Sequence, residues 1–212
     1  QVDLVFAAMP AAVEKLGVPN KTFVTGNPVR PEILRADRDA ARKKLGVAEQ
    51  QICLLSFGGS LGARTINQVV AQLAAWHVQN RDFLHIHATG SYGVQLFHDL
   101  CEENGLLDNP HLVVKEYIDD MASCLAAADL VISRSGAITV SELAAAGRAS
   151  ILIPSPNVAE NHQYYNALEL ATPGAAILIE EKDLTGKKLI ETVDELTQSP
   201  ETLVHMGELA AG

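Results

Sequence analysis

Residues 54–64 read Leu-Leu-Ser-Phe-Gly-Gly-Ser-Leu-Gly-Ala-Arg, an apolar run that ends in a glycine-rich turn. The run from Ile52 to Phe57 has the length and composition of a buried strand, and from Ala63 onward apolar residues recur at helical spacing. Glycine lets a ligand approach the main chain closely, and the first N–H groups of a helix have no partner within the helix. The stretch therefore predicts a strand, a turn and a helix N-terminus, which either binds a phosphate or is only shaped by its glycines.

The neighbouring residues disfavour two common nucleotide-binding motifs. A P-loop has Lys followed by Ser or Thr after its last glycine, whereas Ala63-Arg64 follows here. An NAD site has an acidic residue near the end of the next strand, but the predicted strand from Phe83 to Ala88 runs into Thr89-Gly90. If this turn binds a phosphate, a P-loop or an NAD site is therefore disfavoured.

The composition of the 212-residue chain is that of an ordinary globular protein, with a net charge of −10. This charge argues against nucleic-acid binding, which usually needs a basic surface. No apolar run approaches the roughly 18 residues that span a bilayer, so a cytosolic protein, or one that rests on a membrane through another segment, is expected. The widely spaced Cys53, Cys101 and Cys124 indicate reduced core thiols, and no metal or cofactor is expected.

Strands and helices alternate along most of the chain. After a polar helix at 35–45, the patterns predict strands at 52–57, 83–88, 112–116, 130–133, 150–153 and 175–179, and helices at 63–78, 92–104, 119–128, 137–146, 160–170 and 183–198. Such alternation predicts an α/β fold with a doubly wound parallel sheet and right-handed crossovers.

The two ends of the chain differ from this pattern. Residues 26–31, Gly-Asn-Pro-Val-Arg-Pro, predict a hinge because proline and glycine interrupt regular structure. Residues 1–26 are therefore expected to be the tail of a preceding domain and the hinge, with strands at 2–8 and 22–25 and helical turns at 10–16. Residues 27–212 would form the main domain. Ser199 is expected to cap a last helix that the end of the chain cuts short.

The loops that follow parallel strands open on one edge of the sheet, so their polar residues are expected to form one site. Glu142, early in a predicted helix, can accept both hydroxyls of a ribose, or it can form a capping box with Thr139. Spacing alone favours the capping box. Gln163 can bond sugar hydroxyls, and Arg30 either clamps a phosphate or is solvated. Trp76, His85 and His87 are expected in or beside the core, and Asp119-Asp120 at a helix start.

Five motifs, in order, closely resemble the MurG family of glycosyltransferases. They are Thr-Gly-Asn-Pro-Val-Arg at 25–30, Phe-Gly-Gly-Ser-Leu-Gly-Ala-Arg at 57–64, Tyr-Ile-Asp-Asp-Met at 117–121, Arg-Ser-Gly-Ala-Ile-Thr-Val-Ser-Glu at 134–142 and His-Gln-Tyr-Tyr-Asn-Ala at 162–167. The resemblance implies the Rossmann-like C-terminal half of a GT-B hexosyltransferase, which holds the donor UDP-N-acetylglucosamine. The complete enzyme would transfer N-acetylglucosamine, with inversion, to the lipid-linked muramyl pentapeptide of peptidoglycan synthesis, at the cytoplasmic face of the bacterial inner membrane.

Carried over position by position, the resemblance implies substrate-binding residues in all five motifs. Arg30, Gly59 and Ser60 would contact the diphosphate or adjoining donor atoms. Ile118 would meet the uracil through its backbone, and Gln163 would touch the sugar. The second donor loop would comprise Ala137, Ile138, Thr139, Val140, Ser141 and Glu142, with Glu142 on the ribose.

The resemblance departs from the family at the N-terminal side. The family's N-terminal domain carries the acceptor site, the proposed catalytic base and most of the membrane-facing patch, and only residues 1–25 are expected to belong to it. No catalytic residue is therefore expected in this chain, and the isolated chain is expected to be inactive. Two alternatives are a non-catalytic nucleotide-sugar-binding module that needs a partner chain, and a UDP-sugar epimerase of related fold.

Overall fold

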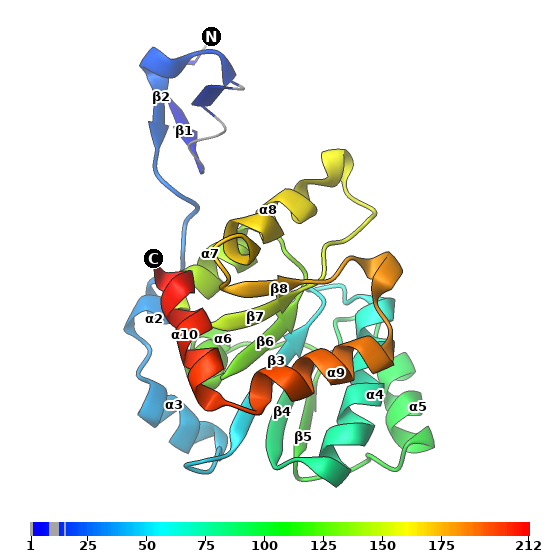
Figure 1. Cartoon of the computed structure of the whole chain (residues 1–212). Coiled ribbons are helices and arrows are strands. Elements are labelled where there is room, and N and C mark those ends of the chain that lie inside the picture. The colour runs from blue at the N-terminus through cyan, green and yellow to red at the C-terminus, as the bar shows by residue number, and fades with distance from the viewer. Residues whose placement is uncertain (1, 9–12, 15) are drawn as a thin grey trace.

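The computed structural model describes residues 2–8, 13–14 and 16–212. Its main body is a six-stranded parallel sheet with helices on both faces (Figure 1). The strands are β3 Ile52–Phe57, β4 Phe83–Ala88, β5 Leu112–Lys115, β6 Leu130–Ser133, β7 Ala149–Leu152 and β8 Ala176–Leu178. The doubly wound α/β class predicted from the sequence is confirmed.

The order of the strands across this sheet is β5-β4-β3-β6-β7-β8. The chain enters at the centre with β3, moves outward to β5, and then crosses to the other side of β3 with β6. Leu55 of β3 accordingly pairs with Ile86 on one side and Val131 on the other. The direction of winding reverses between β3 and β6, and ligands bind such sheets beyond the carboxyl ends of the strands at this point.

Two hydrophobic cores lie on opposite faces of the sheet because neighbouring residues of a strand point to opposite sides. Leu54 is buried in one core with Ile66 and Phe97, and Leu55 in the other with Leu143. The first core is covered mainly by α4 Arg64–Asn80, α5 Val94–Glu103, α9 Gly186–Thr197 and α10 Pro200–Ala211. The second is covered mainly by α2 Pro31–Arg35, α3 Arg38–Leu45, α6 Met121–Ala127, α7 Ala137–Ala146 and α8 His162–Ala171. Short 3-10 turns are η1 Pro19–Lys21, η2 Ala159–Asn161 and η3 Glu181–Asp183.

Most predicted elements are confirmed, and β3, β4, β6 and α7 have the predicted bounds. The helix predicted at 35–45 begins at Arg38, and a separate short helix precedes it at 31–35. Pro31 occupies the first position of α2, where its missing N–H group costs nothing, and Asp37 starts α3 by accepting a 2.8 Å hydrogen bond from the Ala40 N–H. The predicted capping role of Ser199 was wrong, because its hydroxyl bonds the Glu201 carboxylate. The helix that follows runs for 12 residues, longer than the short start that was expected.

A separate two-stranded parallel sheet lies at the N-terminal end, joined to the main body by an extended segment (Figure 1). Its strands, β1 Val5–Ala7 and β2 Thr22–Val24, confirm the two strands predicted there. The predicted helical turns at 10–16 lie largely outside the described residues. Phe6 and Phe23 are paired across the strands, with ring centroids 6.4 Å apart, and both side chains are exposed.

Cys53, Cys101 and Cys124 are buried free thiols, as predicted. Burial is the largest cause that raises the pKa of Cys53 to about 12 and that of Cys124 to about 11. The two thiols are therefore poor nucleophiles at neutral pH. None of the helices in the described part of the chain is long and apolar enough to cross a bilayer.

Candidate functional site

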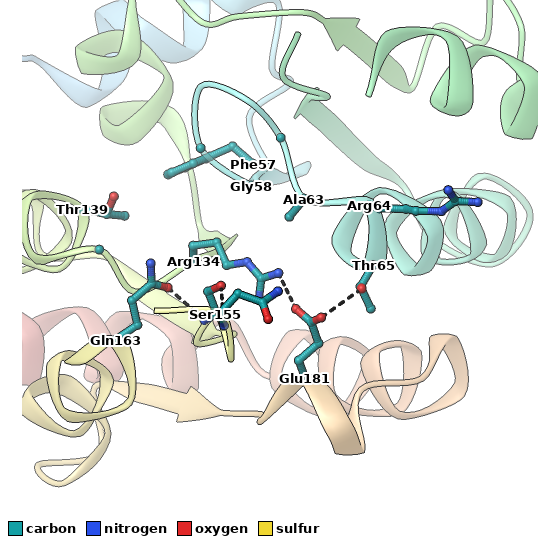
Figure 2. Close-up of a pocket in the computed structure, with 14 residues that line it drawn as sticks. Phe57, Gly58, Ala63, Arg64, Thr65, Arg134, Thr139, Ser155, Gln163 and Glu181 are labelled. Atoms are coloured by element: carbon teal, nitrogen blue, oxygen red, sulfur yellow. Dashed lines mark hydrogen bonds and ion pairs between the residues drawn. The ribbon is translucent and has the colours of Figure 1, made fainter. Parts of the chain in front are cut away.

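A cavity of about 490 Å³ lies at the carboxyl ends of the central strands, where the winding reverses (Figure 2). Its volume is typical of a small-molecule site. Loops after β3, β6 and β7 line it together with η3. The lining residues are Phe57, Gly58, Gly59, Gly62, Ala63, Arg64, Thr65, Arg134, Gly136, Thr139, Ser155, Asn157, Gln163 and Glu181. Its position is the one predicted for a parallel sheet of this kind.

The glycine-rich loop between β3 and α4 packs its main chain tightly. A Cβ atom on Gly58 would come within 2.6 Å of the Ala63 nitrogen, and one on Gly62 within 2.1 Å of the Thr89 carbonyl oxygen. Gly62 also has a φ of +85°, a conformation that costs other residues free energy. Glycine is therefore required here by close approach and backbone conformation together.

Two helix N-termini open onto the cavity, those of α4 and α7. Their N-cap residues are Ala63 and Gly136, neither of which carries a side-chain acceptor. The first-turn N–H groups of both helices therefore remain available to an anion, and both dipoles favour negative charge there. The capping box proposed for Thr139 and Glu142 was wrong, since α7 begins at Ala137 and places Thr139 inside the helix.

Glu142 lies on α7 but does not line the cavity. Its side chain is 9% exposed, and its two carboxylate oxygens accept hydrogen bonds of 2.7 and 2.9 Å from Nε and Nη2 of Arg30. The hydrogen bond to Glu142 is the largest cause that raises the pKa of Arg30. The solvated role considered for Arg30 was therefore wrong. The ribose-binding role of Glu142 stays a prediction.

The segment that was predicted to be a hinge is held against α7. Asn27 Nδ2 donates to Ser141 Oγ at 3.0 Å and to the Ala137 carbonyl at 3.4 Å. Together with the ion pair of Arg30 and Glu142, these bonds join the first motif to the fourth.

Arg30 also lines a second cavity, of about 260 Å³, beside the start of α6. Asp120 in this cavity caps α6 by accepting a 3.0 Å hydrogen bond from the Ser123 N–H, which confirms the predicted role of an acidic residue at this helix start. An ion pair with Lys44 is the main cause that lowers the pKa of Asp120 to about 2. Ile118, just before this turn, has a buried side chain, and its backbone groups make no hydrogen bond to the rest of the described chain.

The wall of the main cavity opposite the glycine-rich loop is braced by Arg134 (Figure 2). Its Nη1 donates to the carbonyl groups of Ile153 and Pro154 at 3.2 and 3.1 Å, and Nη2 pairs with Glu181. Glu181 accepts a further 3.2 Å bond from Thr65 Oγ1. The guanidinium thus joins the end of β7 to η3, and through Glu181 to α4.

Gln163 is the predicted sugar-binding residue on α8. Its Oε1 accepts a 2.9 Å hydrogen bond from the Ser155 N–H, which orients the amide beside the cavity. The N–H groups of this amide have no partner among the residues that the structure describes. They are therefore available to a ligand oxygen.

The predicted substrate-binding residues do not all line one cavity. Gly59, Thr139 and Gln163 line the main cavity, and Arg30 lines the second. Val140 is a core residue and Ile138 is exposed, while Ser60 is exposed at the glycine-rich turn. The remaining residues of the second donor loop, Ala137 and Ser141, contact Asn27 as described above.

Sequence reasoning missed Thr65 and Glu181, both of which line the cavity. Glu181 lies just after the predicted strand 175–179, so the rule that gathered the other strand-end loops could have found it. Thr65 carried no such signal, since a threonine in the first turn of a helix is usually structural. No three or more His, Cys, Asp or Glu residues in the described ranges gather closely enough to hold a metal ion.

Comparison with known proteins identifies the family. The family model named glycosyltransferase family 28 C-terminal domain matches residues 53–211. The chain belongs to glycosyltransferase family 28. A family relative in Desulforamulus reducens, named UDP-N-acetylglucosamine–N-acetylmuramyl-(pentapeptide) pyrophosphoryl-undecaprenol N-acetylglucosamine transferase, is 39% identical over 208 residues, which are 97% of this chain and 56% of the relative. The chain thus spans about half the length of the curated relatives it matches.

Solved structures agree with this family 28 assignment. The crystal structure of Acinetobacter baumannii MurG aligns with a TM-score of 0.69 and 29% identity, over 91% of this chain and 53% of that one. The resemblance noted in the sequence is therefore confirmed. A UDP-GlcNAc 2-epimerase from Neisseria meningitidis, solved with UDP-GlcNAc bound, aligns with a TM-score of 0.62 at 16% identity, over 98% of this chain and 56% of that one. Identity this low shows a shared fold alone.

Proposed function

We propose that this chain binds the nucleotide-sugar donor of a glycosyltransferase of peptidoglycan synthesis. The donor is UDP-N-acetylglucosamine, and the acceptor is the lipid-linked muramyl pentapeptide. The names of the similar proteins and the five sequence motifs support this assignment. The observation that carries it is the cavity of about 490 Å³ between the open N-termini of α4 and α7, lined by Gly59, Thr139 and Gln163.

The diphosphate of the donor would lie between these two helix N-termini. Transfer breaks the bond between the sugar carbon C1 and the diphosphate, so negative charge builds up on the leaving UDP. Preorganised N–H groups and helix dipoles stabilise such charge, and this stabilisation is a large part of catalysis in many enzymes. Arg64, an exposed residue at the first position of α4, adds a positive charge beside the cavity. The free N–H groups of Gln163 would donate to the sugar.

The uridine would lie nearer to Arg30 and the turn after β5. Its uracil would bond the backbone groups of Ile118, and its ribose hydroxyls would donate to Glu142. Both carboxylate oxygens of Glu142 are bonded to Arg30 in this structure. Ribose binding therefore requires Arg30 to share the carboxylate or to turn away from it. The Arg30 side chain is 48% exposed, so it has room to turn toward the diphosphate.

Residues 1–26 would be the tail of an N-terminal domain and the hinge, and residues 27–212 the donor domain. The exposed Phe6 and Phe23 of the N-terminal sheet are consistent with a larger apolar partner there. The acceptor site, the catalytic base and a peripheral contact with the cytoplasmic face of the bacterial membrane would belong to the preceding domain. The chain alone would therefore bind the donor without transferring the sugar.

Calorimetry with three donors tests this proposal. UDP-N-acetylglucosamine should bind, whereas a GDP-sugar and an ADP-sugar should bind at least tenfold more weakly. Equal binding of all three, or binding of none, would contradict it. Incubation of the donor with the chain alone should leave the donor unchanged, since conversion to an epimer would assign a different activity.

Two tryptophan substitutions on α7 locate the donor within the molecule. Thr139→Trp places a large side chain in the cavity and should abolish binding of UDP-N-acetylglucosamine. Ala145→Trp, at an exposed position of the same helix, is the matched control and should leave the affinity unchanged. A folded Thr139→Trp variant with normal affinity would move the donor elsewhere.

A further inference from the structure

A series of buried polar side chains, joined by hydrogen bonds and called the polar series below, runs through the core beneath the glycine-rich loop. It is formed by residues of α4, β3 and β4, and each of them is fully buried. The contacts are His77 Nε2 to His85 Nδ1 at 3.2 Å, His85 Nε2 to Ser56 Oγ at 2.7 Å, Ser56 Oγ to His87 Nδ1 at 2.7 Å, His87 Nε2 to Asn67 Oδ1 at 3.2 Å and Asn67 Nδ2 to the Thr89 carbonyl at 3.0 Å.

The donors in this series can be assigned from its carbonyl end once the rings are taken as neutral, because burial disfavours a charged imidazole. A carbonyl oxygen only accepts, so the Asn67 amide must turn its NH₂ group to Thr89. Its Oδ1 then faces His87, and Nε2 of His87 must carry the hydrogen. Nδ1 of His87 is left as an acceptor, so the Ser56 hydroxyl donates to it.

The assignment continues from Ser56 to His77, at the other end of the polar series. The single hydroxyl hydrogen of Ser56 is used, so its oxygen accepts from Nε2 of His85. Nδ1 of His85 then accepts from Nε2 of His77, and Nδ1 of His77 has no partner in the described part of the chain. In this assignment each of the three histidines carries its hydrogen on Nε2. Burial, which lowers the pKa of His77 to about 4 and that of His87 to about 3, agrees with neutral rings.

The end of the polar series at the Thr89 carbonyl group lies against the glycine-rich loop. A Cβ atom on Gly62 would approach the Thr89 carbonyl oxygen to 2.1 Å. The residues after Thr89 also bond this loop, because the N–H groups of Ser91 and Tyr92 donate to the Ser60 and Leu61 carbonyls at 3.2 Å each. The last hydrogen bond of the polar series, from Asn67 to Thr89, thus holds the segment that packs against the glycine-rich loop.

We propose that His77, His85, Ser56, His87 and Asn67 act in series as positioning residues for the glycine-rich loop. Buried polar groups stabilise a fold less readily than apolar side chains of similar size, because each must be fully hydrogen-bonded. In the polar series every hydrogen bond is donated in the same direction, and one end of the series lies at the loop. Its role is therefore to set the position of the loop, and hence the shape of the anion site. Of the measurements that test this proposal, only the affinity for UDP rests on the proposed donor site.

The hydrogen positions can be measured in the unchanged protein without any ligand. Nitrogen-15 NMR of the three imidazole rings at pH 7 should show each ring neutral, with the hydrogen on Nε2. A ring that is charged, or that carries its hydrogen on Nδ1, would overturn the series. This result stands whether or not the protein binds UDP.

Amino-acid substitutions test whether the polar series positions the glycine-rich loop. Asn67→Asp keeps the acceptor for His87 but replaces the donor to Thr89 by an oxygen that repels its carbonyl. The Ser91 and Tyr92 amides should then exchange their hydrogens about tenfold faster, and the affinity for UDP should fall about tenfold. Ser56→Ala, which interrupts the polar series earlier, should change both quantities in the same direction. Unchanged amide exchange in both variants would contradict the proposal.

The double variant Ser56→Ala/Asn67→Asp separates action in series from independent packing. It should lose no more UDP affinity than Asn67→Asp alone, whereas multiplied losses would contradict the proposal. Val193→Ala, which creates a cavity in the core beside α9, is the stability control. It should lower the melting temperature without changing UDP affinity. If the unchanged protein does not bind UDP, the donor proposal fails, and amide exchange together with the ring nitrogens still decides the positioning role.

Discussion

Two residues that the resemblance assigns to different parts of the donor contact each other in this structure. Arg30 and Glu142 are 112 positions apart and form a two-bond ion pair. Because Glu142 is nearly buried, leaving its carboxylate without a partner would be costly. Arg30 provides that partner and fixes the orientation of the carboxylate by two hydrogen bonds.

Glu142→Gln tests the ribose contact at this position. The variant keeps the size of the side chain but loses its charge, so UDP should bind about 10- to 100-fold more weakly, since a hydrogen bond to a charged group contributes roughly 1.5–3 kcal/mol. Calorimetry should show little change in the affinity for inorganic pyrophosphate, which has no ribose. Equal losses for both ligands would contradict a contact with the ribose. The melting temperature should change little, because Arg30 is half exposed.

Gly62→Ala tests the close approach between the glycine-rich loop and Thr89. Gly105→Ala is the matched control, because both glycines have positive φ, +85° and +66°, but a Cβ on Gly105 meets open space. The control should lose about 1 kcal/mol of unfolding free energy from backbone strain alone. Gly62→Ala should lose roughly 1–3 kcal/mol more from overpacking against Thr89. Urea denaturation measures both, and equal losses would mean that the loop is not packed as described.

The two helices that open onto the main cavity lack a side-chain cap. The N-cap residues of α4 and α7 are Ala63 and Gly136, whereas that of α9 is Thr185, whose Oγ1 accepts a 3.1 Å hydrogen bond from the Lys188 N–H. The first two helices lack a side chain that would compete with a ligand for their N–H groups. A cap contributes to stability, and its omission leaves an anion site.

Thr185→Ala and Ser199→Ala form a matched pair that tests helix capping. Both residues precede a helix of 12 residues, but only Thr185 bonds a backbone N–H group. Thr185→Ala should therefore lower the free energy of unfolding by about 1 kcal/mol. Ser199→Ala should lower it by only a few tenths, since its hydroxyl bonds the exposed side chain of Glu201. Thermal and urea unfolding would measure both, and a larger loss for Ser199→Ala would reverse the assignment of the caps.

The stability of the whole molecule should depend on pH through its buried histidines. Burial lowers the pKa of His77 to about 4 and that of His87 to about 3, whereas unfolded histidine titrates near pH 6.5. Between these values the unfolded chain binds more protons than the folded one. The free energy of unfolding should therefore fall as the pH drops below about 6.5, by roughly 1 kcal/mol per pH unit for each such histidine.

Urea unfolding between about pH 6.5 and 5 measures this dependence before most carboxylates titrate. His77→Gln removes one of the histidines and should give a shallower slope than the unchanged protein. His205→Gln, at an exposed position of α10, is the control and should leave the slope as it is. Equal slopes for His77→Gln and the unchanged protein would contradict the neutral state assigned to His77.

The sequence predicted helices and strands well where the local hydrophobic pattern is strong. It predicted them less well where the hydrogen-bond partner of one side chain decides where a helix starts. The bounds of β3 and β4 follow from apolar runs that end at glycine or a polar residue. The division of 31–45 into two helices depended on Asp37, whose capping bond has the same local chemistry as many loop aspartates. The capping box at Thr139 failed because the helix starts at Ala137, as the periodicity predicted, and a residue inside the first turn cannot be its N-cap.

By itself the sequence determined the alternation of strands and helices, the parallel sheet and the edge at which the main cavity lies, because hydrophobic periodicity and chain connectivity are local properties. Only the tertiary structure decided the partners of the polar side chains. The bonds of Arg30 to Glu142, of Thr65 to Glu181 and of Ser56 to two histidines join residues between 29 and 116 positions apart. A charge or hydroxyl takes whichever partner the packed strands and helices bring within about 3 Å, and no local pattern encodes that distance.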